Sequence, residues 1–198
     1  MNPIIDLKFC EWTEGKGSLE ARISIFEHIR DIPYATIPRI ISAQHYAEIL
    51  TLGKGSCTPK HLLLADMFEQ LGITVLLAVY PFRWADVEID LPPSLQERVE
   101  SLPDDYHLAC RAEIGGNLVL VDATVDLALE MLGLPVNREW DGVSDTLLAV
   151  EPSGEEQLYH PSEAMFINNV SIDAAHLAFF DELNSWLDEV RKLSLSDE

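Results

Sequence analysis

The residue with the clearest potential for chemistry is Cys57, which follows the glycine-rich segment Gly53-Lys54-Gly55-Ser56. Pro59 and the apolar stretch His61–Leu71 come next, so the cysteine is expected in the first turn of a buried helix. Unpaired backbone amides and the helix dipole favour an anion at that position and stabilise a thiolate. Because the thiolate is the nucleophilic form of cysteine, Cys57 is the candidate nucleophile of a cysteine-dependent reaction.

A nucleophilic thiolate needs a base within hydrogen-bond reach and a third group that orients the base. His107 and Asp122 lie in two β-type segments that flank Gly115 and Gly116. If these glycines form a two-residue turn, Asp122 pairs with Ala109 and is one diagonal step from His107 on the same face. The hairpin therefore predicts that His107 is the base and that Asp122 orients it.

The same register predicts how the hairpin packs. Leu118 and Leu120 share a face with Asp122 and are expected to pack on the Cys57 helix. The residues expected on the opposite face are Cys110, Val119 and Val121. One extra turn residue would send Asp122 to that opposite face, because the side-chain period along a strand is two.

A zinc site is an alternative use of the same residues. Cys57, His61, His107 and Cys110 offer two thiolates and two imidazoles, which suit zinc. Cys57 and His61 share a helix face, but His107 and Cys110 point to opposite faces of a regular strand. The triad is therefore favoured over the metal site, and no cofactor is expected.

Spacing and turn residues predict helices that mostly precede strands, a pattern typical of an α+β fold. The predicted helices are Ser18–Arg30, Ala43–Leu50, His61–Leu71 and an amphipathic His176–Lys192. The predicted strands are Ile73–Tyr80, Tyr106–Ile114 and Leu118–Ala123. The proline-containing segment 86–105 is either a helix flanked by loops or a mobile lid.

Composition limits the class of protein. A chain of 198 residues can bury one sizeable core, so a single domain over residues 1–198 is expected, with its core at about 18–150 and C-terminal strand and helix elements at 151–198. Acidic residues outnumber basic ones by 34 to 13, a formal charge of −21 that would repel nucleic acid. There is no signal-like or membrane-length apolar run, and three scattered cysteines do not form a disulfide framework. A cytoplasmic protein with no membrane partner is expected.

Several short motifs occur in an order that resembles a known family. They are Ile29-Arg30-Asp31-Ile32-Pro33-Tyr34, Gly55-Ser56-Cys57, Lys60, Leu71-Gly72-Ile73, His107 and Asp122-Ala123-Thr124. This set covers about half of the chain and resembles the bacterial members of the transglutaminase-like superfamily of cysteine enzymes and cysteine peptidases. The resemblance implies a papain-like core in which a catalytic helix packs on an antiparallel sheet.

The resemblance also implies acyl transfer, with Cys57 as nucleophile, His107 as general base and acid, and Asp122 as the orienting carboxylate. The substrate would be a peptide, a protein or a small amide or ester, and the acyl group would pass to water or to an amine. The amide of Cys57 is a natural oxyanion donor, and Gln44 or Tyr46 are candidate side-chain donors. A catalytically silent domain that binds a peptide or protein is the other alternative, and the sequence makes no prediction of the oligomeric state.

Overall fold

The structure, a computed structural model, describes residues 2–164 and 172–194. Its helices are α1 (Pro3–Thr13), α2 (Ser18–Arg30), α3 (Ile49–Leu52), α4 (Cys57–Gln70), α5 (Pro93–Val99) and α7 (Ala174–Ser194). Its short 3₁₀ helices are η1 (Pro38–Ile40), η2 (Tyr46–Glu48), η3 (Trp84–Asp86), η4 (Leu127–Leu132) and η5 (Pro161–Glu163). Within the described ranges, no helix is long and apolar enough to cross a membrane.

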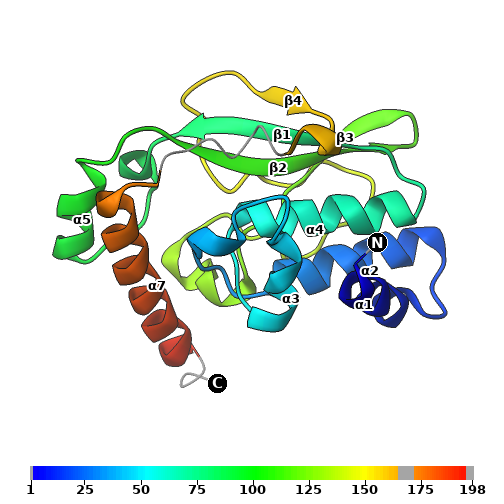
Figure 1. Cartoon of the computed structure of the whole chain (residues 1–198), viewed down its shortest axis with the longest axis horizontal. Helices are drawn as coiled ribbons and strands as arrows, with labels where there is room; N and C mark the ends of the chain where they lie inside the picture. The colour runs from blue at the N-terminus through cyan, green and yellow to red at the C-terminus, as the bar shows by residue number, and fades with distance from the viewer. Residues whose placement is uncertain (1, 165–171, 195–198) are drawn as a thin grey trace.

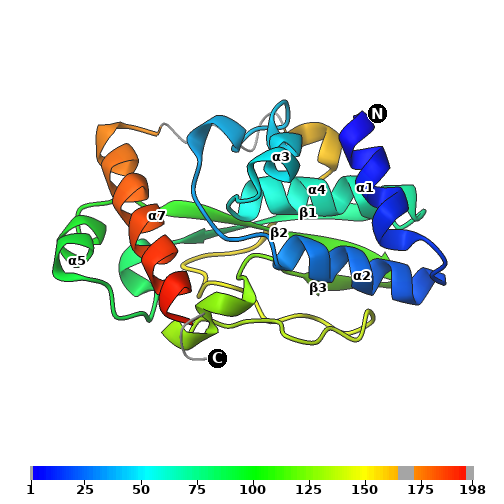
Figure 2. The ribbon, with the colours of Figure 1, turned by 90° about the horizontal axis from the view of Figure 1, so that it is seen from below.

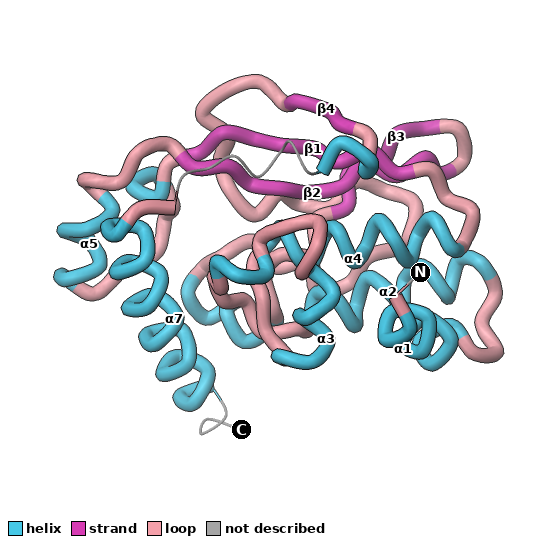
Figure 3. The backbone as a smooth tube through the Cα atoms, viewed as in Figure 1, coloured by secondary structure: helices cyan, strands magenta, loops and turns pink. Residues whose placement is uncertain are grey.

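One four-stranded antiparallel sheet organises the fold. Its strands β1 (Val75–Phe82), β2 (Asp105–Ile114), β3 (Asn117–Val121) and β4 (Gln157–Tyr159) lie in the order β3-β2-β1-β4. Figures 1 and 3 show α1 to α4 gathered on one side of this sheet, and Figure 2 shows the same helices from below. This mixture of helices and an antiparallel sheet agrees with the predicted α+β class.

Helix α4 lies at the centre because it is apolar around most of its circumference. Leu63, Leu64, Met67 and Phe68 are fully buried, and they join a cluster that also includes residues of α1, α2 and the central strands. The helix ends before Gly72, whose φ of 76° falls in the left-handed region that glycine adopts freely. The predicted buried central helix is therefore present, and it begins at Cys57.

The hairpin between β2 and β3 has the predicted register. Gly115 and Gly116 have φ values of 60° and 83°, the positive values that a two-residue type I′ turn requires. Ile114 pairs with Asn117 across this turn, and the last pair in the ladder is Cys110 with Val121. Asp122, the next residue, therefore falls opposite Ala109 as predicted.

The prediction of which face packs on α4 is wrong. Leu118 is exposed, and Leu120 packs with Tyr80 and Ala109 in a small cluster apart from the one that contains α4. The hairpin residues that do share the α4 cluster are Cys110, Val119 and Val121. The prediction assumed that α4 lies along the face that carries the polar pair. Instead, the first turn of α4 reaches that pair where β3 ends, since the side chain of His61 bonds to the backbone of Ala123.

Other segments differ from prediction at their ends. The expected helix Ala43–Leu50 starts later, as η2 and then α3, because Ser42 first forms a turn in which its carbonyl accepts from Tyr46 N–H. Helix α1 was not predicted, although Asn2 caps it and Pro3 opens it. Strand β4 is only three residues long, and it lies in the C-terminal region where strand and helix elements were expected without exact bounds. In the segment 86–105, the structure has helix α5 flanked by loops.

Helix α7 packs its apolar stripe on a second cluster, which confirms the predicted amphipathic helix. The stripe consists of Phe179, Phe180, Leu183, Leu187 and Val190. Near the end of α7, Arg191 donates two hydrogen bonds to the carboxylate of Asp126, at 2.7 and 3.2 Å, and a third to the carbonyl of Tyr34. This guanidinium therefore ties the C-terminal helix to two segments of the central part of the protein.

We expect that Arg191→Met lowers the free energy of unfolding by about 3 kcal/mol or more, because it leaves Asp126 as a charge without its cationic partner. The side chains of Arg191 and Asp126 are only 13% and 5% exposed. Arg98→Met is the matched control, since Arg98 pairs with Glu182 where both are solvent-accessible, and should cost no more than about 1 kcal/mol. Urea unfolding measures both changes, and equal losses would show that the Arg191 contact is not special.

Candidate functional site

Cys57 is the first residue of α4, as the sequence predicted. Ser56, immediately before it, has an extended backbone, so the chain enters the helix directly at the cysteine. Gly55 allows this entry, because a Cβ atom there would lie 2.6 Å from the side chain of Ile49. The thiol is partly buried and lines a cavity, a position that a nucleophile facing a substrate requires.

His107 and Asp122 form a buried pair. Nε2 of His107 donates to Oδ2 of Asp122 over 2.8 Å, and each residue is 2% exposed. The carboxylate also accepts the backbone N–H groups of Thr124 and Ala149, at 2.9 and 2.8 Å. Burial alone would raise the pKa of Asp122, but the charge and hydrogen bond of His107 outweigh it and hold that pKa well below its usual range. Asp122 is therefore ionised and fixes the orientation of the imidazole.

The imidazole of His107 also interacts with Cys57. Asp122 occupies Nε2 of His107, so Nδ1 is the ring nitrogen left for Cys57, which also contributes to the pKa of the imidazole. Burial opposes protonation of His107, but the charge and hydrogen bond of Asp122, followed by those of Cys57, raise its pKa to about 10. At neutral pH the imidazole thus holds a proton beside the sulfur, which is the charge state that stabilises a thiolate.

His61 supports the pair from α4. Its Nε2 accepts the N–H of Ala123 at 2.9 Å, so the ring proton is on Nδ1, which donates to the carbonyl of Cys57 at 2.9 Å. Burial lowers the pKa of His61 to about 4, which keeps this imidazole neutral even though the carboxylate of Asp122 is 3.5 Å away. His61 therefore positions the strand end and the cysteine, a role that the sequence did not assign to it.

Lys60 adds a second tie between the same elements. Its fully buried ammonium donates to the carbonyls of Arg30, Ala123 and Thr124, at 2.9, 3.3 and 2.8 Å. Burial lowers the pKa of Lys60 to about 7, although neighbouring carboxylates act in the opposite direction. The sequence shows a single lysine in a largely apolar helix, which indicates that Lys60 has a special role. It does not show the partners of Lys60, because they are backbone carbonyls and not side chains.

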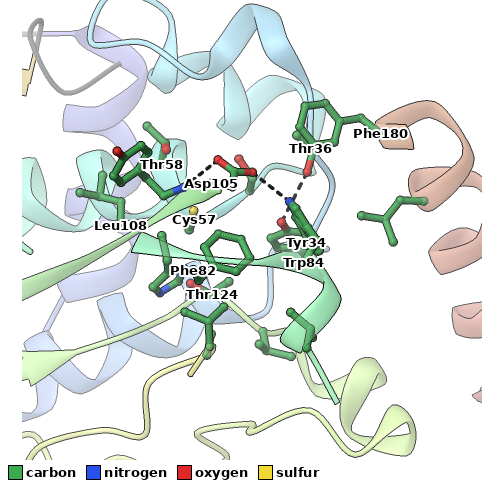
Figure 4. A pocket seen from close by; sticks show the side chains of 18 of the residues that line it. Tyr34, Thr36, Cys57, Thr58, Phe82, Trp84, Asp105, Leu108, Thr124 and Phe180 are labelled. Atoms are coloured by element: carbon green, nitrogen blue, oxygen red, sulfur yellow. Dashed lines mark hydrogen bonds between the residues drawn. The ribbon is translucent and has the colours of Figure 1, made fainter. Parts of the chain in front are cut away.

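A cavity of about 140 Å³ opens beside the thiol (Figure 4). Tyr34 lines it together with Cys57, and the hydroxyl of Tyr34 lies 3.4 Å from that of Thr36. Burial, and then the charge of Cys57, raise the pKa of Tyr34, so its phenol stays neutral and able to donate. Tyr34 is held in place by its N–H, which donates to Asp126 at 2.7 Å. On either side of it, Ala35 N–H donates to the carbonyl of Gly55, and Gly55 N–H donates to the carbonyl of Pro33.

The two side-chain oxyanion candidates are not at this site. Gln44 is exposed in a turn, and the hydroxyl of Tyr46 donates to Asp66 in the middle of α4 at 2.7 Å. Neither of them lines the cavity beside Cys57. Their position upstream of the cysteine was the reason for choosing them, whereas Tyr34, which does line the cavity, lies earlier in the chain.

The four residues of the zinc alternative do not converge. His61 uses both ring nitrogens for backbone bonds, and the buried thiol of Cys110 donates to the carbonyl of His61 at 3.4 Å. Burial also raises the pKa of Cys110 well above its usual value, which opposes the thiolate form that zinc binds. Across the described residues, no group of three or more histidine, cysteine or acidic side chains is arranged to hold a metal ion.

Comparisons with known proteins add no assignment. Family models, curated proteins and solved structures gave no match to the chain.

We expect His107 to remain protonated well above its ordinary pKa of 6.5, with a midpoint near 10. Titration of its imidazole by NMR measures this directly. Asp122→Asn should lower the midpoint most and Cys57→Ala should lower it less, because Asp122 contributes more to the shift. A midpoint near 6.5 in the wild-type protein would contradict the charge state described above.

The same shift has a consequence for stability. A folded pKa above the unfolded value stabilises the fold fully below about pH 6.5, and the contribution is lost as the pH rises through about 10. The lowered pKa of Lys60 has the opposite effect on the free energy of unfolding. It destabilises the fold below about pH 7, and this loss is relieved as the pH rises above 7. For this reason the imidazole signal itself, identified with His107→Asn, is a sharper measurement than unfolding at several pH values.

Proposed function

We propose that this protein is a cysteine-dependent acyl-transfer enzyme in which Cys57 is the nucleophile, His107 the general base and acid, and Asp122 the orienting group. The observation that carries the proposal is the buried 2.8 Å bond from His107 to Asp122, with the imidazole pKa raised jointly by Asp122 and Cys57. A buried histidine with only a structural role has no need of a thiol at the start of a helix on its other side.

The reaction follows from where the protons lie. The sulfur of Cys57 attacks the acyl carbonyl carbon and forms a C–S bond, while His107 gives its proton to the leaving nitrogen or oxygen as that bond breaks. Water or an amine then attacks the thioester and loses a proton to His107, and the thiolate leaves. Asp122 keeps its negative charge throughout and holds the imidazole in the orientation that both steps need.

The oxyanion that forms at the carbonyl needs donors in the cavity. The backbone N–H of Cys57 belongs to the first turn of α4, where amides have no partner within the helix. We propose the hydroxyl of Tyr34 as the side-chain donor, in place of Gln44 and Tyr46. It lines the same cavity, and it remains a neutral phenol because its pKa is raised.

The order of the elements supports the proposal that the chain has a transglutaminase-like, papain-like core. A helix that begins with the nucleophile precedes two antiparallel strands, the first with the histidine and the second followed at once by the carboxylate. The acyl donor on this proposal is a peptide, a protein or a small amide or ester. The alternative is a protein that keeps this arrangement only to bind a peptide or protein. The following measurements distinguish it from an enzyme.

Alkylation by iodoacetamide at pH 6 should modify Cys57 much faster than Cys10 or Cys110. Cys10 is the informative control, because it is exposed but has no imidazole partner of this kind, whereas Cys110 is buried. Asp122→Asn should slow the labelling of Cys57 and leave that of Cys10 unchanged, since it removes the charge that holds a proton on His107. Peptide mass spectrometry gives the rates, and equal rates at Cys10 and Cys57 would remove the main support for nucleophilic catalysis.

Reaction with para-nitrophenyl butanoate should leave a butanoyl group on Cys57 and release nitrophenolate, and Cys57→Ala should abolish both. Tyr34→Phe should lower kcat by about a hundredfold with little change in KM, because it removes one oxyanion donor. Tyr159→Phe is the control, since its hydroxyl bonds to Gln157 away from the cavity. Full kcat in Tyr34→Phe would eliminate Tyr34 as the donor, and acylation that persists in Cys57→Ala would eliminate the mechanism.

A further inference from the structure

Two residues that line the cavity beside Cys57 each have a buried side-chain atom with no hydrogen-bond partner. The atoms are Oγ1 of Thr124 and Nε2 of His176, and they are the unsatisfied buried side-chain atoms found among the described residues. Their residues are only 5% and 2% exposed. A buried polar atom without a partner costs about 1–3 kcal/mol, so native proteins rarely keep one that nothing ever satisfies. The two atoms indicate where a ligand places polar groups.

The rest of the cavity is largely apolar. Its walls come from the central strands, the loop after β1, the segment after β3 and α7, and they include Val79, Phe82, Leu129, Phe180, Leu183 and Leu187. Such a lining suits an aliphatic or aromatic chain, whereas it offers little to a highly polar or charged ligand. The cavity therefore favours a ligand that is mostly apolar and has few polar groups.

His176 is the more informative of the two polar groups. It lies in the first turn of α7, and its Nδ1 is 2.8 Å from Oδ1 of Asp173. With a carboxylate on Nδ1, the proton of the neutral ring is on that nitrogen, and the lone pair of Nε2 is left as an acceptor. The ring packs against Phe180, 5.9 Å away between centroids, so an apolar neighbour adjoins this acceptor. A hydroxyl or amide N–H on an otherwise apolar chain is the group that fits.

We propose that this cavity is the acyl-binding pocket, and that it takes an apolar acyl chain with a hydroxyl or amide N–H that donates to Nε2 of His176. This inference rests on the proposed function, because the chain is placed by its bond to the sulfur of Cys57. Thr124 has a different part. It lines the same cavity, and its N–H donates to the carboxylate of Asp122 that orients His107, so Thr124 belongs to the catalytic end of the cavity and not to α7.

The experiment compares para-nitrophenyl alkanoates with their ω-hydroxy counterparts, from the butanoyl to the decanoyl esters, on the full-length protein. Cys57 is first acylated, which forms the thioester and releases nitrophenolate. Water then hydrolyses the thioester and frees the thiol. At one chain length or two adjacent lengths, wild type should favour the hydroxylated ester in kcat/KM by about tenfold, the value of one good hydrogen bond. The unmatched lengths serve as internal controls.

Three variants assign this preference to a residue. His176→Phe should abolish the preference for the hydroxylated ester, while His176→Gln, which keeps a hydrogen-bonding group, should retain part of it. Asp173 is left solvated in both, since its side chain is 61% exposed. Thr124→Val should lower kcat/KM for both esters equally and leave their ratio unchanged. A preference lost in Thr124→Val but kept in His176→Phe would overturn the role of His176.

The outcomes separate this inference from the proposed function. Turnover of all esters with no preference for a hydroxyl at any length would overturn the inference and leave acyl transfer intact, with water alone serving His176. Failure of every ester to acylate Cys57 would overturn both. Because the wild-type ratio decides the first point, the test does not depend on whether His176→Phe folds.

Discussion

The carboxylate of Asp122 is a charge in a part of the protein that water scarcely reaches, and that placement is tolerable only if every oxygen finds donors. Three donors meet it, from His107 on β2, from Thr124 just beyond β3 and from Ala149 in a later loop. Each comes from a different segment, so the requirement to satisfy one charge fixes three parts of the chain relative to one another. A change in hairpin register would leave the charge without these partners, which makes the register strongly specified.

Helix α4 is tied to the same point by its own polar side chains. Lys60 and His61 are fully buried in an otherwise apolar helix, and between them they bond to the backbone of Ala123 and Thr124. Burying these two groups is costly, and apolar packing alone would hold the helix more cheaply. The polar bonds fix the orientation of α4, and with it the position of Cys57 relative to the end of β3. A reaction that requires sulfur, imidazole and carboxylate in line depends on that precision.

The sequence predicted what local patterns encode. A cysteine behind glycines, an apolar helix and a Gly-Gly turn have strong local signals, and they led to the helix start at Cys57, the hairpin register and the contact between His107 and Asp122. The sequence did not predict interactions between a side chain and distant backbone, such as those of Lys60 and Ala149. It also assigned the wrong hairpin face to α4, because alternation shows which residues share a face but not from which end a helix approaches.

Helix α7 is the element farthest along the chain that lines the cavity. On the proposed function, the reacting groups and the residues that choose the substrate therefore come from different parts of the sequence. Cys57, His107 and Asp122 lie within residues 57–122, whereas the apolar lining of the cavity includes Phe180, Leu183 and Leu187 from α7. Arg191 fastens that helix to Asp126 and to the backbone of Tyr34, and thereby sets the distance between the wall and the proposed oxyanion donor. Substitutions on the inner face of α7 can therefore change which acyl chain fits, while the bonds to Asp122 that orient His107 remain intact. On the proposed function, the bonds that satisfy the buried charge of Asp122 hold the reacting groups in place, whereas apolar side chains of α7 and His176 line the acyl pocket.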